Sequence, residues 1–492
     1  MRSLTSSLDI GQRDRSIEPL YRLALTRDAN STTYNEDRII SVDHLEEPFH
    51  GAATVVLDNS DLAVTTDFKG YQGILSYGVK GSAGDERSAC APMHVTGQVD
   101  HSSEGVLTVT LTLQGLADEL SDDKASAQHT QLSTDLGTLK DLLTQVVKAV
   151  LPVWAVATVK ALDDLVKPTA ANGLAYKCTV AGTTHATTQP TFPTTIGNTV
   201  ADNTVTWTCI GKEVTAFSHC RAYTPTFDSE DSVFDVFNPA DSFSLALNTS
   251  RLDAIEKLLR YTKNVMRVDA DGQIHFRQPV VSLSTYDNEY KLDVNGVHDI
   301  FALANREVLL NPNYVVVTSH PDDGDGFTGS AEDTASSDIT NMEKREHYYV
   351  RAASNAECAS LAAAIIEKYQ SAQQKGAALV PLHCGQEVHD YINFTDSRSD
   401  ETRAGNIGAI RRVCGDGKFE MQIALGDVRQ GGFLGMAPTR RVDPLAARQA
   451  RDAARAQLTE TEILKSLPGL VDNLYRIITS LIEQVNASFA EQ

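Results

Sequence analysis

The first part of the chain alternates hydrophobic and polar residues with a period of two. The clearest runs are 21–25 and 107–113, where every second side chain is apolar or aromatic. Successive side chains of an extended strand point to opposite faces, so such a run has one buried face and one wet face. Turn-forming segments at 58–61, 81–85 and 103–105 separate the runs. The pattern predicts several short strands over residues 17–115, arranged as a barrel or a sandwich.

A helical period replaces the alternation further along the chain. Leucine and valine recur every three or four residues from 134 to 151, and Pro152 ends the predicted helix. Residues 251–263 place four apolar side chains on one helical face, and residues 356–371 predict another helix.

Further strands are expected in the second half of the chain. The segments 265–268 and 273–276 flank an Asp-Ala-Asp-Gly turn and predict a hairpin. Strands are also expected at 405–413 and 418–425. Residues 322–338 are acidic and rich in glycine and serine, so they are expected to form a mobile loop.

Residues 155–213 differ in composition from their surroundings, being rich in threonine, glycine and proline and poor in charge. The change predicts a small β module inserted into a larger protein. Its aromatic residues Tyr176, Phe192 and Trp207 have two interpretations. Exposed rings could stack on a host glycan, but in so small a unit aromatic residues usually form the core. We favour the core.

Composition limits the function classes. The chain has 492 residues, of which 41% are hydrophobic and 22% charged, which suggests three or four ordered units. Its formal net charge of −22 argues against tight DNA binding, which depends on lysine and arginine displacing counterions. None of the 7 cysteines form a CxxC pair, which argues against a zinc knuckle or a disulfide framework and fits a reducing cytoplasm. The start of the chain has no apolar core typical of a signal peptide, and the longest apolar stretch, 146–159, is too interrupted to span a bilayer.

Candidate chemistry is sparse. No nucleophile elbow, phosphate-binding loop, HExxH or dinucleotide fingerprint is present, so we expect no enzymatic activity and no cofactor. His383, His389 and Asp390 could hold a metal or exchange protons, but their spacing matches no common ligand pattern, and we favour a structural role. Asp323 and Asp325 fit part of a calcium loop whose first ligand position is occupied by Pro321, so we favour a solvated acidic loop and expect no metal.

Several segments resemble the hub proteins of phage baseplates and tail tips. The first are Thr-Thr-Asp-Phe-Lys-Gly at 65–70, Gly-Asp-Glu-Arg-Ser at 84–88 and Ala-Pro-Met at 91–93. Then come Asn-Thr-Ser-Arg-Leu-Asp-Ala-Ile-Glu-Lys-Leu-Leu at 248–259 and Asp-Gly-Gln-Ile-His-Phe at 271–276. The last are Gln-Glu-Val-His-Asp at 386–390, Thr-Asp-Ser-Arg at 395–398 and Gly-Asn-Ile-Gly-Ala-Ile at 405–410.

The insert resembles a small β module that recurs in phage tail and fibre proteins. The similarity lies in Asp-Leu-Val-Lys-Pro at 164–168, Ala-Asn-Gly-Leu-Ala-Tyr-Lys-Cys-Thr at 171–179, Gln-Pro-Thr-Phe-Pro at 189–193 and Thr-Val-Thr-Trp-Thr-Cys at 204–209. It points separately to a phage virion.

These resemblances imply a mainly β protein with α (α+β). They imply two tail-tube-like β-barrel domains, intervening α/β segments, the inserted module and a C-terminal helix. Three chains would form a six-barrel ring that joins the tail tube to the distal tip, lines the DNA channel and holds spike or fibre proteins. The expected partners are two further copies of the chain, the tail tube or distal tail protein and tip proteins. DNA would pass without specific binding, and the host envelope could be contacted. The location would be the virion, after assembly in the host cytoplasm.

The predicted domains follow the changes in pattern. They are a first barrel at 1–120, a helical connector at 121–154, the insert at 155–213, a central α/β domain at 214–340, a second barrel at 341–432 and a helical extension at 433–492. Three alternatives remain: a receptor-binding fibre component that uses the insert for a glycan, a cell-wall hydrolase, and the hub of a phage-like contractile injection system. The hydrolase needs paired carboxylates or a Cys–His pair in a cleft.

The C-terminal extension ends in a predicted amphipathic helix. Leu470, Leu474, Ile477 and Leu481 repeat at spacings of four and three, which forms a heptad seam. A helix of about two heptads is marginal alone in water, so we expect it to pack between chains or against a tip protein, with docking on its own chain as the alternative. Replacing Leu474 and Leu481 with Asp should then abolish tip assembly and leave the barrels folded.

Overall fold

The computed structural model describes most of the chain up to residue 426 and is predominantly β, as the sequence predicts. The described residues are 1–13, 17–81, 84–103, 106–280, 284–292, 300, 302–307, 312–319, 326–371, 373–398, 401–415 and 417–426. The mainly β class with α segments is therefore confirmed.

The first β unit contains eight strands and one short helix. They are α1 (Ser6–Gly11), β1 (Pro19–Arg27), β2 (Asn30–Asn35), β3 (Ile39–Glu47), β4 (His50–Asp58), β5 (Gln72–Gly81), β6 (Gly84–Ala89), β7 (Met93–Ser103) and β8 (Val106–Gly115). The two alternating runs seen in the sequence lie in β1 and β8, and most of their apolar side chains are buried. The strand order is β2-β1-β5-β7-β8-β4-β3, with β6 beside β5.

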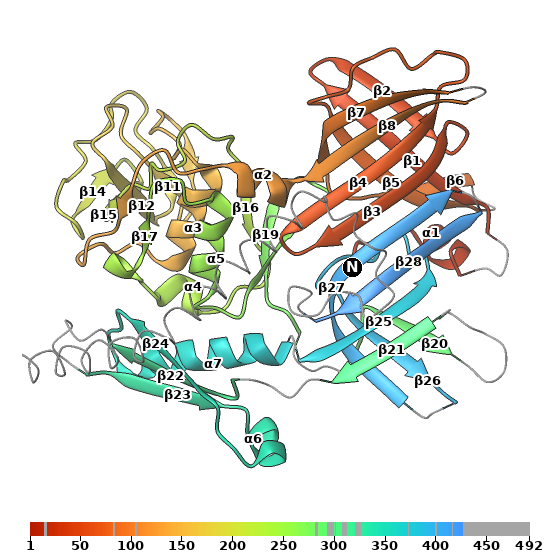
Figure 1. Cartoon of the computed structure of the whole chain (residues 1–492). Helices are drawn as coiled ribbons and strands as arrows, with labels where there is room; N and C mark the ends of the chain where they lie inside the picture. Colours follow the sequence, from red (N-terminus) through yellow and green to blue (C-terminus); the bar gives the residue numbers. More distant parts are fainter. Residues whose placement is uncertain are drawn as a thin grey trace, which may run out of the picture. The chain divides into compact units, whose positions relative to one another are not determined.

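The second β unit contains six strands: β20 (Asn288–Leu292), β21 (Ala302–Glu307), β25 (Gln374–Pro381), β26 (Tyr391–Asp396), β27 (Glu401–Gly415) and β28 (Lys418–Leu425). Its strand β27 pairs antiparallel with β3, so the two units form one continuous sheet (Figure 1). One hydrophobic core contains side chains from both units, for example Leu75 and Ile410.

An α/β region occupies most of the middle of the chain. Its elements are α2 (Leu116–Asp122), β9 (His129–Thr130), α3 (Leu139–Lys148), β16 (Pro225–Phe227), α4 (Val233–Val236), η1 (Ala240–Ser242), β17 (Ser244–Leu245), α5 (Arg251–Leu259), β18 (Val265–Val268) and β19 (Ile274–Arg277). It continues with β22 (Tyr314–Ser319), β23 (Thr328–Glu332), α6 (Thr334–Thr340), β24 (Arg345–Val350) and α7 (Asn355–Ser371). These elements share a second core, which buries apolar side chains of α3, α5 and α7.

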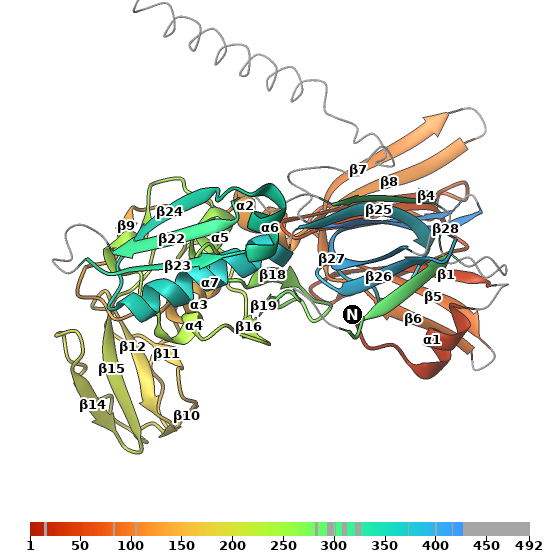
Figure 2. The ribbon, with the colours of Figure 1, turned by 90° about the horizontal axis from the view of Figure 1, so that it is seen from below.

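The insert is a separate small β structure with its own core. Its strands are β10 (Val159–Lys160), β11 (Leu165–Val166), β12 (Leu174–Val180), β13 (Gly182–Thr183), β14 (Thr199–Asp202) and β15 (Val205–Lys212), which form a four-stranded sheet in the order β11-β12-β15-β14 and a two-stranded sheet β10-β13 (Figure 2).

The predicted helices and hairpin are confirmed as α3, α5, α7 and β18–β19, with shorter bounds for α3 and α5. The prediction of a loop throughout 322–338 is wrong, because β23 lies within this segment and α6 begins in it. At Gly329 an added Cβ would lie 2.2 Å from a backbone nitrogen of α7, so this glycine allows β23 to approach the helix closely. Asp333 caps α6 by accepting a hydrogen bond from the Ser336 amide.

The sheet topology differs from the domain scheme in one respect. Strands β20 and β21 lie within 214–340, yet they pair with strands of the second β unit. The segment around β22–β24 is therefore inserted between strands of one sheet, a long-range pairing that local sequence patterns do not reveal. Among the described strands the main sheet path runs from β2 to β21 without closing, so barrel closure stays a prediction.

None of the helices in the described part of the chain combines the length and the apolar character required to cross a membrane.

Candidate functional site at the junction of the two β units

The junction of the two β units is an antiparallel pair in which Arg412 of β27 lies opposite His44 of β3. The neighbouring Arg411 points to the other face and forms an ion pair with Asp43, with 2.5 Å between Nε and Oδ1. Because adjacent strand residues face opposite ways, one arginine lies near the surface and the other in the interior.

Arg412 is fully buried. Its Nη1 lies 2.9 Å from the Glu46 carboxylate, and its Nη2 donates to the Gln386 carbonyl at 2.6 Å. The guanidinium also lies over the Tyr77 ring, 5.5 Å from the centroid. Burial raises the pKa of Glu46, but Arg412 and its neighbours outweigh burial and lower that pKa to about 2. Glu46 is therefore ionised at neutral pH.

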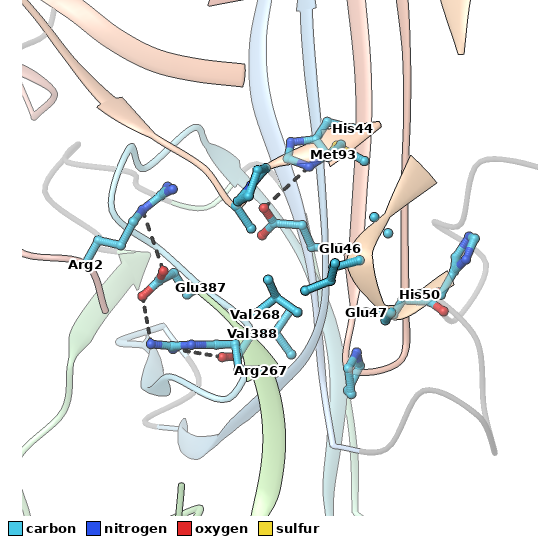
Figure 3. Close-up of a pocket in the computed structure, with 17 residues that line it drawn as sticks. Arg2, His44, Glu46, Glu47, His50, Met93, Arg267, Val268, Glu387 and Val388 are labelled. Carbon is cyan, nitrogen blue, oxygen red and sulfur yellow. Dashed lines mark hydrogen bonds and ion pairs between the residues drawn. The ribbon is translucent and has the colours of Figure 1, made fainter. Parts of the chain in front are cut away.

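A second set of ion pairs connects the β18–β19 hairpin with the loop before β26 (Figure 3). Arg267 Nη2 lies 3.1 Å from Glu387, and its Nη1 lies 3.2 Å from Asp390. Arg2 Nε lies 3.8 Å from the other oxygen of Glu387. Burial raises the pKa values of both carboxyl groups, and Arg267 opposes the effect. Such pairs add little net stability, but they fix geometry, because an uncompensated buried charge is costly.

His44 lies between the Tyr77 hydroxyl and the Glu46 carboxylate. Its Nδ1 is 3.0 Å from the Tyr77 hydroxyl, and its Nε2 is 3.4 Å from Glu46 Oε1. Burial lowers the pKa of His44 to about 4, so the ring is neutral at pH 7. A cavity of about 70 Å³ opens beside it, lined among others by Arg2, Glu46 and Glu387. That volume is large enough for water molecules.

The three aromatic residues of the insert lie in its core. Tyr176 and Trp207 are fully buried, and 8% of Phe192 is exposed. The Tyr176 hydroxyl donates to the Pro193 carbonyl, and the Trp207 Nε1–H donates to Asp202 at 2.9 Å. These rings are packed against one another and offer no open face to a sugar.

The other predicted site residues are not brought together as a reactive site. His383 Nε2 lies 2.9 Å from the Gln12 amide nitrogen, and Asp390 takes part in the Arg267 ion pairs. Burial lowers the pKa of His383 to about 4 and that of His389 to about 3, so both rings are neutral at pH 7. Leu470, Leu474, Ile477 and Leu481 lie outside the described residues, as do Asp323 and Asp325.

A cluster of one histidine and two carboxylates occurs around the β18–β19 hairpin. His275 Nδ1 lies 2.9 Å from Asp228, and Asp269 is the other acidic member. Arg277 Nε lies 3.0 Å from Asp228, and Arg267 Nε lies 2.6 Å from Asp269. Arginine already contacts the Asp228 oxygen that faces His275 and both oxygens of Asp269, so neither carboxylate keeps an oxygen beside His275 for a metal and this cluster is an ion-pair network.

Sequence reasoning missed the grouping of His44, Glu46 and Arg412. His44 and Glu46 are two residues apart on β3, which is a usable signal for a shared face. The position of β27 beside β3 depends on a pairing across more than 360 residues, for which the chain carries no local signal.

No family model and no curated protein match the chain. Among solved structures it is similar to a tail protein of Neisseria meningitidis MC58, with a TM-score of 0.47, 9% identity, and coverage of 82% of this chain and 96% of that one. It is also similar to the 43 kDa tail protein of prophage MuSo2 from Shewanella oneidensis, with a TM-score of 0.46, 9% identity, and coverage of 82% and 98%. A type VI secretion component of E. coli gives a TM-score of 0.40 at 9% identity, with coverage of 82% and 76%.

The first two of these structures are phage or prophage tail proteins, the broader class to which the hub proteins named by the sequence resemblance belong.

Proposed function

We propose that this chain is a structural hub of a phage tail tip, where three copies form a ring that joins the tail tube to the distal tip. The observation that carries the proposal is the β3–β27 pairing, which joins two antiparallel β units of one chain edge to edge. Three copies would supply six such units, the number needed to continue a six-fold tube. The hub-like segments at 65–93, 248–276 and 386–410 support the same role.

The ends of the continuous sheet support assembly into a ring. Among the described strands, β2 pairs only with β1, and β21 pairs only with β25. The β2 sequence, Asn-Ser-Thr-Thr-Tyr-Asn, has neither the lysine nor the proline that commonly protects an exposed edge. Pairing between neighbouring chains would cover both edges.

The charge of the chain supports a DNA channel without DNA binding. With a net charge of −22, a ring of three chains repels a phosphate backbone more than it attracts it. We propose that the wall of the channel is predominantly acidic and that DNA slides through it. In this role the chain is a virion component assembled in the host cytoplasm, it contacts tube, spike or fibre proteins, and it catalyses no reaction.

Two of the three alternatives concern the insert and the surroundings of the ring. The glycan-binding fibre component depended on exposed aromatic rings in the insert, and these rings are buried. The hub of a contractile injection system is distinguished from a phage hub by the particle that surrounds it, and not by this chain alone.

Cryo-electron microscopy of assembled particles tests the proposal. We expect three copies in a ring coaxial with the tube, with β2 of one copy near β21 of the next. A hexamer, or a single copy at the tip, would overturn it. Binding of the purified chain to duplex DNA at low salt should be absent, and a continuous basic lumen would refute the sliding model.

A further inference from the structure

Three metal-binding side chains of different chemistry meet beside the β3–β27 junction. His44 and Glu46 lie on one face of β3, and Cys90 directly follows β6. One donor atom from each lies within 4.8 Å of the other two. His44 and Cys90 are buried, and the backbone amide of Cys90 donates to Leu75 of β5 at 2.8 Å. The backbone thus holds the thiol beside the two β3 side chains.

Each of the β3 donors is oriented by a further partner. The Tyr77 hydroxyl contacts His44 Nδ1, which leaves Nε2 facing Glu46. Arg412 contacts Glu46 Oε2, which leaves Oε1 facing His44. Metal-binding histidine and carboxylate groups in proteins are commonly held in this way, through the atom that does not touch the metal.

The spacing suits a small tetrahedral cation. Zinc bonds of about 2.0–2.3 Å place neighbouring ligand atoms roughly 3.3–3.7 Å apart. His44 Nε2 and Glu46 Oε1 are 3.4 Å apart, which already matches. The Cys90 sulfur has to move closer to the other two ligand atoms by about 1.5 Å at most, which a change of its side-chain torsion achieves. Water from the adjoining cavity, which both β3 side chains line, can take the fourth position.

The charges at the site permit a dication. A divalent ion with one thiolate and one carboxylate is neutral overall. Arg412 would stay paired with Glu46 through Oε2, and Arg2 lies near Glu387.

We propose that His44, Glu46 and Cys90 bind one thiophilic divalent cation of the Zn²⁺ class, with a water molecule as the fourth ligand. Binding releases the Cys90 proton to solvent and connects β3 to the chain segment after β6. The competing arrangement is a hydrogen bond to Glu46 from the neutral His44 ring with its hydrogen on Nε2, and this arrangement needs no metal. The proposal is independent of the hub role.

Cobalt(II) titration of the full chain without an affinity tag tests the site. A tetrahedral cobalt–thiolate centre absorbs in the near ultraviolet by charge transfer and in the visible by d–d transitions. We expect both bands to saturate at one equivalent and to disappear on addition of Zn²⁺. The Cys90→Ser variant should lose the charge-transfer band, whereas Cys220→Ser, which alters a half-buried thiol outside the cluster, should keep it.

Two further variants keep the test decisive if Cys90→Ser folds poorly. His44→Gln should lose tight cobalt binding, and Tyr77→Phe should weaken zinc affinity about 10- to 100-fold, as loss of an orienting partner does. The proposal is overturned if the wild-type chain shows no charge-transfer band, or if the band survives in Cys90→Ser or His44→Gln.

Discussion

Replacement of Arg412 by methionine tests the role of the buried charges at the junction. The change removes the guanidinium that lies 2.9 Å from Glu46, donates to Gln386 and covers the Tyr77 ring. Methionine fills part of the volume, so the main loss is electrostatic. Removing one partner of a buried ion pair costs about 3–5 kcal/mol, because the other charge stays buried. Arg2 lies near Glu46 as well and compensates part of the loss, so we expect about 3 kcal/mol.

Urea unfolding followed by far-ultraviolet circular dichroism measures the effect. Both tryptophans pack in the core of the insert, Trp207 from within it and Trp154 from the residue directly before it, so their fluorescence reports mainly on that module. We expect Arg412→Met to shift the dichroism transition to lower urea and to leave the fluorescence transition in place.

The neighbouring Arg411 provides a matched control. It is on the same strand, but its partner Asp43 is 45% exposed, so Arg411→Met should cost about 0–1 kcal/mol. Adding Glu46→Gln to Arg412→Met should recover part of the lost stability, because it removes the buried carboxylate charge that Arg412→Met leaves without a partner. Equal costs for Arg411→Met and Arg412→Met would refute the reasoning.

Three further predictions follow from single contacts. Lys177→Met leaves the buried Asp141, which lies 3.2 Å from the lysine Nζ, without its cation. We expect the free energy of unfolding, measured by tryptophan fluorescence in urea, to fall by an amount at the lower end of about 3–5 kcal/mol. An unchanged unfolding transition would contradict this prediction. Gly329→Ala forces a methyl group into the backbone of α7 and should lower the free energy of unfolding by about 1–3 kcal/mol, measured by thermal unfolding. Gly326→Ala places its methyl group in open space and should not lower it. Equal effects of the two changes would rule out the close approach of β23 to α7. The pKa of Glu46 is lowered to about 2 in the folded chain. The ionised Glu46 carboxylate therefore stabilises the fold above the pKa that it has in the unfolded chain, and this stabilisation is lost as the pH falls towards 2. Between about pH 5 and 2, unfolding midpoints should fall more steeply in the wild type than in Glu46→Gln.

Local patterns predicted the elements well wherever a segment buries one face. The alternation in β1 and β8 and the helical spacing in α5 and α7 follow from side-chain geometry within a few residues. The acidic segment 322–338 was misjudged because glycine and serine are typical of loops. In the folded chain Gly329 is required by the approach of α7, a contact with residues about 30 positions away.

The candidate site was beyond local patterns for a different reason. The sequence alone predicts that Arg412 lies on the surface, since arginine is rarely fully buried unless it is paired. Its partner Glu46 is far away in the sequence, and only the register of β27 against β3 brings them together. Cys90 likewise has no second cysteine near it in the sequence, so no CxxC signal marks it as a metal ligand.

The buried charges at the junction explain how two β units of one chain can pair in a single register. A sheet that continues from one unit to the next has no turn at the junction to fix the alignment of β3 and β27. A shift of β27 by one residue would turn Arg412 to the surface and place Arg411 in the core. It would remove the partner of Glu46 and bury the side chain that now pairs with Asp43. The penalty for an unpaired buried charge thus favours the observed register over its nearest alternatives, although the pairs themselves add little stability. In a ring built from this sheet, the same alignment would set the relation between the two units of every copy.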